Sequence, residues 1–273
     1  MLPDPKNGTS IRILDVHHHL AAGEGTDRPD VLSRRIQLMD SFGIDAACLM
    51  PPSGAFGDSA SMEDMNDATA SVCGQHPDRF PAGLIHLDLS HAETTVLAEL
   101  ERAHSQLGLH GVVFHHRFQG VFLDHPTMVS VLRRCADRGL TVFIHVVGES
   151  TLESAWRLEA LIEKAGTNSP IVALDAFSSS DRAFDVLRLC IRKPNVFVDL
   201  GAMNAAVGYA LDAFLGEIGP ERILVGTDLY MEPTNYHFPF AIHEALHLEL
   251  DTGSKQQMLD GNARRLLGLP TPL

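Results

Sequence analysis

The sequence predicts an α/β protein whose 273 residues form a single-domain (β/α)8 barrel, or TIM barrel. Eight short apolar runs alternate with longer amphipathic segments, which is the pattern of successive strand–helix units on a parallel sheet. Such barrels typically occupy about 250 residues as one unit, and no linker interrupts the interior of this chain. We therefore expect a flexible N-terminus over residues 1–10 and one barrel over residues 11–273.

The expected strands are short and almost entirely apolar, as strands covered on both faces must be. In chain order they are Ile11–Val16, Ala46–Met50, Ala82–Leu87, Gly111–His115, Thr141–His145, Ile171–Leu174, Val196–Leu200 and Ile223–Gly226. Amphipathic segments bounded by Gly, Pro, Asn or Asp lie between them and are expected to be helical: Asp30–Phe42, Ala92–Leu107, Thr127–Arg138 and Ser180–Arg192.

Eight consecutive units favour a closed barrel over an open doubly wound sheet. The doubly wound alternative needs a phosphate-binding glycine loop directly after its first strand. Gly23 and Gly25 lie there, but Arg28 occupies the place of the third glycine. The sequence therefore predicts the barrel, with any active site at the carboxyl ends of its strands.

The chain is acidic, with 35 Asp and Glu residues against 21 Lys and Arg residues and a formal net charge of −14. Phosphate backbones and anionic membranes repel such a chain, so we expect neither a nucleic-acid nor a membrane partner. The N-terminal sequence MLPDPKNGTS has no signal-peptide pattern. We expect a cytoplasmic protein that acts on a small molecule, either as a monomer or as a homo-oligomer.

Histidine is abundant, with 15 residues, and three of these follow the first expected strand in the segment ILDVHHHL. Because side chains alternate along a strand, His17 and His19 should point to one face together with Asp15, whereas His18 should point to the other. Two imidazoles on one face at the mouth of a barrel can hold a divalent ion. A chance run of histidines on a loop is the alternative.

Two further strands end in side chains that can bind a metal. The fifth expected strand is apolar until His145, and Asp228 follows the eighth. Either group would be costly to bury without a partner. A hydrogen-bonded core histidine and a capping aspartate are the alternatives. Since all strands of a barrel end at one mouth, we expect one metal ion, with a position open for water, among His17, His19, His145 and Asp228.

With these residues in this order, the sequence resembles the metal-dependent amidohydrolase superfamily, in the branch that contains aminocarboxymuconate-semialdehyde decarboxylase and related hydrolases. The resemblance spans most of the chain and implies a distorted (β/α)8 barrel with those four residues around the metal. Zn is the first choice of metal, and Mn, Fe or Co are the alternatives. The resemblance rests on ILDVHHHL, GLHGVVFHHRFQGVFLDHP, GLTVFIHVVG, NVFVDLG, RILVGTDLY and MLDGNARRLLGL.

The sequence departs from the family pattern at two positions. Relatives commonly carry a histidine at the end of the sixth strand, whereas the segment IVALDAFSS places Asp175 there. Binuclear relatives also carry a lysine on the fourth strand that becomes carboxylated, whereas the segment GVVFHH contains no lysine. The resemblance therefore implies a single metal ion, and it does not extend to polarisation of the substrate by a sixth-strand imidazole.

The chemistry expected first is hydrolysis. A divalent ion lowers the pKa of a bound water towards about 7, and Asp228 could accept the water proton and return it to the leaving group. Such an enzyme would cleave an amide, lactone or ester-like bond in a small molecule. One alternative is a metal-dependent nonoxidative decarboxylase or lyase of a small unsaturated or aromatic acid, with Asp175 as a proton donor. Another is a catalytically impaired barrel that acts as a binding protein.

Five side chains near the expected mouth are candidates for contact with the substrate. His115 and His116 end the fourth strand, and only one of two adjacent strand residues can face the barrel interior. Arg117 follows them and could bind a carboxylate in bidentate fashion. Tyr230 and His237 lie beyond Asp228 in the segment YMEPTNYHFPF. An exposed loop arginine is the alternative for Arg117.

Overall fold

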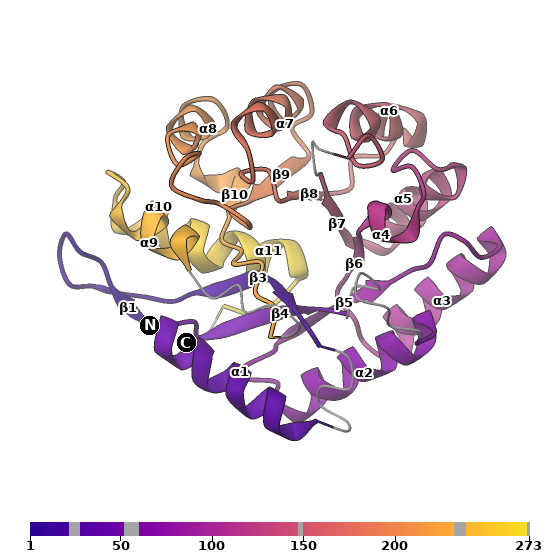
Figure 1. Cartoon of the computed structure of the whole chain (residues 1–273), viewed down its shortest axis with the longest axis horizontal. Helices are drawn as coiled ribbons and strands as arrows, with labels where there is room; N and C mark the ends of the chain where they lie inside the picture. The colour runs from indigo at the N-terminus through magenta and orange to yellow at the C-terminus, as the bar shows by residue number, and fades with distance from the viewer. Residues whose placement is uncertain (22–27, 52–59, 147–149, 232–238, 272–273) are drawn as a thin grey trace.

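The computed structural model describes residues 1–21, 28–51, 60–146, 150–231 and 239–271. Eight parallel strands form one sheet in which each pairs with its neighbour in the chain, so the predicted barrel is confirmed (Figure 1). The strands are β3 (Leu14–His19), β4 (Ala46–Met50), β5 (Ala82–His86), β6 (Gly111–Phe114), β7 (Thr141–His145), β8 (Ile171–Leu174), β9 (Val196–Asp199) and β10 (Ile223–Leu224).

The last strand is shorter than expected, and the residues after it nearly close the barrel against the first. The amide of Val16 donates to the carbonyl of Val225 at 3.0 Å, and the amide of His19 donates to the carbonyl of Leu229 at 3.0 Å. This pairing brings the segment after β10, including Asp228, beside the histidines of β3.

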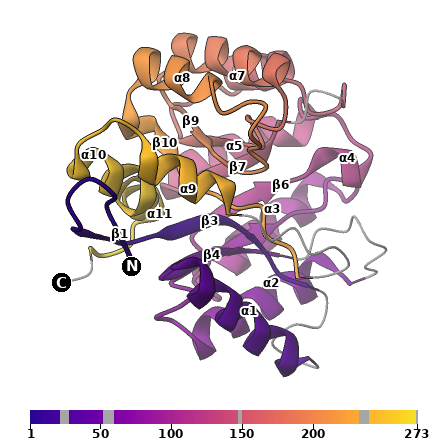
Figure 2. The same ribbon diagram turned by 60° about the vertical axis from the view of Figure 1, so that its left-hand side comes forward.

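Helices cover the outside of the strands, as Figures 1 and 2 show. Between strands lie α1 (Pro29–Phe42), α2 (Met62–Gln75), α3 (Glu93–Ser105), α4 (His116–Gln119), α5 (Pro126–Arg138), α6 (Ala155–Ala165), α7 (Ser180–Arg192) and α8 (Ala210–Ile218). The final segment contains α9 (Phe240–His247), α10 (Thr252–Gln256), a π-helical turn (Gln257–Gly261) and α11 (Asn262–Leu267).

Local sequence explains why these helices begin and end where they do. Helix α5 begins at Pro126, because proline lacks an amide that the first turn would leave unpaired. It ends before Gly139, whose φ of 68° is in the left-handed region that glycine adopts without steric cost. Apolar side chains fill the space between sheet and helices, and a second cluster, which includes Leu14, Phe143 and Leu266, fills the barrel interior.

The N-terminal segment is the main departure from the expected elements. Residues Leu2–Pro3 (β1) pair antiparallel with Ser10–Ile11 (β2), and the barrel strand begins only at Leu14. Asp4 is buried, and the ammonium of Lys255 contacts its Oδ1 at 3.0 Å and donates to the carbonyl of Leu246 at 2.6 Å. These contacts anchor a segment expected to be flexible, because its partners come from the other end of the chain.

Among the helices within the described ranges, none combines the length and the apolar character needed to cross a bilayer.

Candidate metal centre

Four ligand atoms, from strands β3 and β7 and from the segment after β10, meet at the carboxyl-terminal mouth of the barrel. The Nε2 atom of His17 lies 2.9 Å from Nε2 of His19 and 3.2 Å from Nε2 of His145. The Oδ1 atom of Asp228 lies 3.2 Å from Nε2 of His17 and 3.4 Å from Nε2 of His19. All three imidazoles are buried. The structure thus brings together the four residues predicted to hold the metal.

The Nδ1 atoms of His145 and His17 lie beside hydrogen-bond acceptors, which directs the Nε2 atoms of these two rings to the metal position. Nδ1 of His145 lies 2.8 Å from the carbonyl oxygen of Phe114, which can only accept a hydrogen bond. Nδ1 of His17 lies 2.7 Å from Oδ2 of Asp199. Such contacts leave Nε2 free to bind a metal and orient the ring, as in most histidine metal sites. Lone pairs aimed at one point repel one another, so the set fits a bound cation.

The charges around His17 also favour a cation. Burial opposes a charged imidazole there, but the carboxylates of Asp228, Asp199 and Asp175 outweigh this and raise the pKa of His17 to about 10. Burial and the charge of His17 hold the pKa of His19 and His145 well below the ordinary value. The cluster therefore takes up positive charge, which a divalent ion supplies directly.

Asp175 lies beside this ligand set rather than within it. Its Oδ1 is 3.9 Å from Nδ1 of His17 and has no hydrogen-bond partner in the described part of the chain. Burial raises the pKa of both Asp175 and Asp228, and the charge of Asp228 raises that of Asp175 further. Their φ angles of 61° and 54° lie in the left-handed region, a strained conformation for a non-glycine residue that often marks functional sites.

Asp15 does not share the side of His17 and His19, so that expectation is wrong. Its Oδ2 lies 2.8 Å from Nδ1 of His18, and its Oδ1 accepts from the amides of His17 and Thr227, both at 3.0 Å. The pairing of β3 with β4 shifts register between Asp15 and His18, which breaks the simple alternation of side chains. Asp15 instead joins β3 to the segment after β10.

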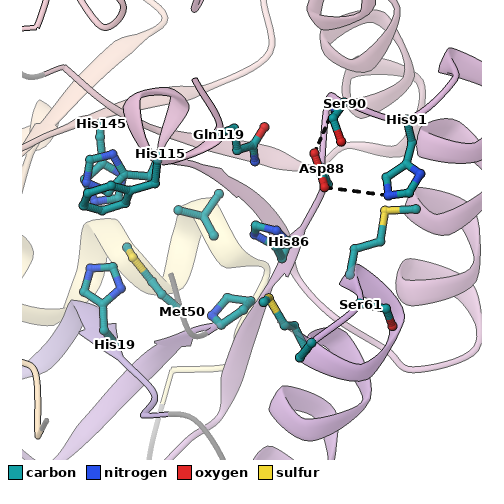
Figure 3. A pocket seen from close by; sticks show the side chains of 16 residues that line it. His19, Met50, Ser61, His86, Asp88, Ser90, His91, His115, Gln119 and His145 are labelled. Carbon is teal, nitrogen blue, oxygen red and sulfur yellow. Dashed lines mark hydrogen bonds and ion pairs between the residues drawn. The ribbon is translucent and has the colours of Figure 1, made fainter. Parts of the chain in front are cut away.

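A cavity of about 470 Å³ opens beside the ligand set. His19, His115 and His145 line one end, and His86, Asp88 and His91 line the other, as Figure 3 shows. The wall between them includes the apolar side chains Met50, Met65, Val113 and Phe118. A small molecule in this cavity would thus have one end at the metal ligands and its body against apolar side chains.

The two adjacent histidines after β6 take different positions. His115 lines the cavity, and its ring stacks on that of His145 with centroids 3.9 Å apart and an interplanar angle of 7°. His116 is fully buried, stacks on Phe114 at 5.3 Å and is not part of the cavity wall. A substrate contact at His116 stays a prediction, and in this structure the chain turns into α4 at this residue and its ring lies in the core against Phe114.

The remaining predicted contacts lie at the edge of the site or outside the described residues. The guanidinium of Arg117 packs over the ring of Phe118 at 4.9 Å, and this side chain is not part of the cavity wall. Tyr230 stacks on His19 with centroids 4.1 Å apart and an interplanar angle of 12°. His237 lies in the 232–238 range, outside the residues that the structure describes.

Two buried carboxylates at the site were not predicted. Asp199 ends an apolar strand at the same mouth, which is the signal that identified His145 and could have identified it too. Glu153 lies in the connection after β7, where no spacing pattern marks it. Its Oε1 is 2.7 Å from Nδ1 of His115. Asp199 contacts His17 and Glu153 contacts His115, and of the two only Glu153 needs the three-dimensional structure to be found.

Known proteins resemble this chain along most of its length. The family model described as Amidohydrolase matches residues 14–166 and 179–269. The 2-amino-3-carboxymuconate-6-semialdehyde decarboxylase of Dictyostelium discoideum is 25% identical over 283 residues, which cover 88% of this chain and 77% of that protein.

Two solved structures share the fold. The 5-carboxyvanillate decarboxylase LigW from Sphingomonas paucimobilis has a TM-score of 0.68 at 16% identity, covering 96% of this chain and 100% of that one. A dihydroxybenzoic acid decarboxylase from Polaromonas sp. JS666, with bound manganese and the inhibitor 2-nitroresorcinol, has a TM-score of 0.68 at 17% identity, covering 95% of this chain and 97% of that one. From the family match, the fold and the ligand set together, the chain belongs to the amidohydrolase superfamily, in the branch of aminocarboxymuconate-semialdehyde decarboxylase.

Proposed function

We propose that this enzyme is a metal-dependent nonoxidative decarboxylase of a small unsaturated or aromatic carboxylic acid. The observation that carries the proposal is the convergence of three imidazole Nε2 atoms and one Asp228 oxygen at one end of a cavity whose wall is part polar and part apolar. Hydrolysis was the first expectation from the sequence, but the names of the similar proteins favour decarboxylation, its alternative.

His17, His19, His145 and Asp228 would hold the metal. A set of three nitrogens and one oxygen suits Zn, and one structural relative contains bound manganese. A divalent cation bound there supplies positive charge that anchors the substrate carboxylate and offsets negative charge that develops on neighbouring oxygens. The hydrogen bonds of His17 to Asp199 and of His145 to the Phe114 carbonyl keep these two ligand rings in place.

Decarboxylation requires a proton on the carbon that bears the carboxylate. The C–C bond then breaks, its electron pair returns to the unsaturated system, and carbon dioxide leaves. We assign this proton to Asp175, which is buried and has an Oδ1 without a hydrogen bond to described residues. Burial and the charge of Asp228 raise its pKa and favour the protonated acid. Water returns the proton to Asp175 after the product leaves.

The apolar part of the cavity would orient the body of the substrate. Met50, Met65 and Val113 offer flexible or branched side chains that can pack against a flat unsaturated molecule. They also exclude water from the reacting carbon, which strengthens electrostatic interactions at the neighbouring ligand set.

The test is carbon dioxide release from a panel of unsaturated and aromatic acids by Zn- or Mn-loaded enzyme. We expect metal-dependent release with at least one acid, and a loss of about 100-fold or more in kcat for Asp175→Asn, because this side chain cannot donate the proton. Asp181→Asn, at an exposed position in α7, is the matched control and should keep full activity. Metal-dependent hydrolysis of a lactone or amide panel without any carbon dioxide release would overturn the proposal.

A further inference from the structure

Glu153 is a fully buried carboxylate that lies outside the metal ligand set. Its Oε1 lies 2.7 Å from Nδ1 of His115 and accepts a hydrogen bond from the amide of Arg117 at 2.9 Å. Its Oε2 has no hydrogen-bond partner in the described ranges, and Nε of Arg117 is 3.9 Å away. A buried acid with one unpaired oxygen is costly to the fold, which suggests a functional reason for its position.

The contacts of Oε1 define the tautomer of His115. The Arg117 amide can only donate, so this oxygen acts as an acceptor towards it. When Glu153 is ionised, or is protonated on Oε2, Oε1 can only accept. His115 must then carry its proton on Nδ1 and a lone pair on Nε2, because the hydrogen bond of one ring nitrogen determines the state of the other.

The lone pair of Nε2 is available to a molecule in the cavity. His115 lines the cavity and Glu153 does not, so the Nδ1 edge of the ring points away from the cavity and the Nε2 edge towards it. Nε2 makes no hydrogen bond to a described residue. It is also not one of the fully buried side-chain atoms that lack a hydrogen-bond partner. The ring lies parallel to that of His145, so this acceptor is directly beside a metal ligand (Figure 3).

We propose that Glu153 is a positioning residue that holds His115 in the Nδ1–H tautomer, so that Nε2 accepts a hydrogen bond from a hydroxyl or amino group of the bound acid. The inference rests on the proposed function for the statement that the ligand is an acid. The pair makes the site selective, because a site built to accept a hydrogen bond discriminates against an analogue that cannot donate one.

The tautomer can be measured without any substrate. In Zn-loaded protein labelled with ¹⁵N-histidine, long-range ¹H–¹⁵N correlation at pH 8 distinguishes Nδ1–H from Nε2–H, and the signal missing from His115→Gln identifies His115. We expect Nδ1–H in the wild type and in Glu153→Gln, whose amide oxygen can still accept, and Nε2–H in Glu153→Met. A wild-type His115 in the Nε2–H form, or no change in Glu153→Met, would overturn the inference.

Selectivity is tested by titration calorimetry with 2-hydroxybenzoate and 2-methoxybenzoate as probes. We expect the wild type to bind the hydroxy acid about tenfold more tightly, which corresponds to one hydrogen bond, and Glu153→Met to bind both about equally. Asp260→Asn is the matched control, because Asp260 is buried and bonded to Arg264 far from the cavity, and it should keep the wild-type ratio. Equal ratios in wild type and Glu153→Met contradict the inference.

The two proposals fail separately. The histidine tautomer does not depend on turnover, so an Nδ1–H form of His115 in an enzyme that releases no carbon dioxide contradicts only the decarboxylase assignment. Carbon dioxide release together with an Nε2–H form contradicts only the role of Glu153. The Zn content and melting temperature of Glu153→Met show that this variant is folded. Glu153→Gln, whose side chain has the same size as Glu153 and can still accept from His115, is the second variant measured by calorimetry.

Discussion

The carboxylate of Asp199 lies between two N–H donors, and this makes its charge hard to replace. Oδ2 contacts Nδ1 of His17 at 2.7 Å, and Oδ1 accepts from the amide of Asp175 at 3.0 Å. In Asp199→Asn the amide group would face one of these donors with its own N–H, so only one hydrogen bond survives. We expect metal affinity to fall by about 10- to 100-fold, as for other partners of metal-binding histidines.

A chelator competition titration with Zn measures this loss. Asp212→Asn, an exposed substitution in α8, provides the control and should leave the affinity unchanged. If Asp199→Asn binds Zn as tightly as the wild type, Asp199 does not support the ligand His17.

Glu153 also predicts a pH dependence of stability. Burial raises its pKa from 4.5 to about 7 in the folded protein. Between these pH values the folded state holds the proton and the unfolded state has released it, so this residue lowers stability as pH rises through the interval, and its effect then levels off. The full effect is about 3 kcal/mol, from about 1.4 kcal/mol for each pKa unit.

Glu153→Gln stays neutral and lacks this slope. We expect the free energy of unfolding of the variant, relative to wild type, to increase by about 3 kcal/mol between pH 5 and pH 8. Urea unfolding in the presence of a chelator measures it without a contribution from metal binding. Glu163→Gln, at an exposed position, should differ from wild type by less than about 0.5 kcal/mol at both pH values. Parallel pH profiles for wild type and Glu153→Gln would show that burial of Glu153 is not costly.

At the level of strands and helices, the sequence predicts most of the fold correctly. Strands β4, β7 and β8 begin and end at the expected residues, because an uninterrupted apolar run leaves few alternative positions for the ends of a strand. The first barrel strand was expected to end at Val16 and instead runs to His19. Histidine is polar, so the apolar pattern does not predict that these residues belong to the strand. The strand includes them because they pair with β4 and with Leu229.

The loop after β9 carries a glycine that the site requires. A Cβ at Gly201 would lie 2.5 Å from Nδ1 of His17 and would also overlap Oδ2 of Asp199. Gly201→Ala must therefore displace the His17–Asp199 pair. We expect it to destabilise the protein by about 1–3 kcal/mol, as overpacking does, and to weaken Zn binding.

Gly216→Ala is the matched control, because a Cβ at this position in α8 meets nothing within 4 Å. It should stabilise the protein by about 0.5–1 kcal/mol through helix propensity and leave Zn binding unchanged. Thermal unfolding and Zn titration of both variants give the comparison. Normal Zn affinity in Gly201→Ala would mean that the loop moves aside at no cost to the ligands.

For the whole molecule, the barrel explains why the metal ligands could be predicted from the sequence and why Glu153 could not. Parallel strands all end at one mouth, so His17, His145 and Asp228 could be placed together from strand order alone. The hydrogen bond of Glu153 to His115 depends on how the connection after β7 folds back over α4, which no local pattern records. The contact of Asp4 with Lys255 likewise joins opposite ends of the chain.

Because its ligands come from β3, β7 and the segment after β10, a metal ion would join distant parts of the chain, and this set exists only in the folded barrel. Binding to the folded state alone adds about 2.7 kcal/mol at a free metal concentration of 100 times Kd. We expect Zn to raise the melting temperature by about 5–10 °C, given the usual few degrees per kcal/mol for a chain of this size.

His19→Gln, which removes one ligand, should lose most of this increase. His104→Gln should keep it, because His104 contacts the carbonyl of Leu109 away from the mouth. An equal increase in His19→Gln and His104→Gln would place the stabilising metal elsewhere on the protein.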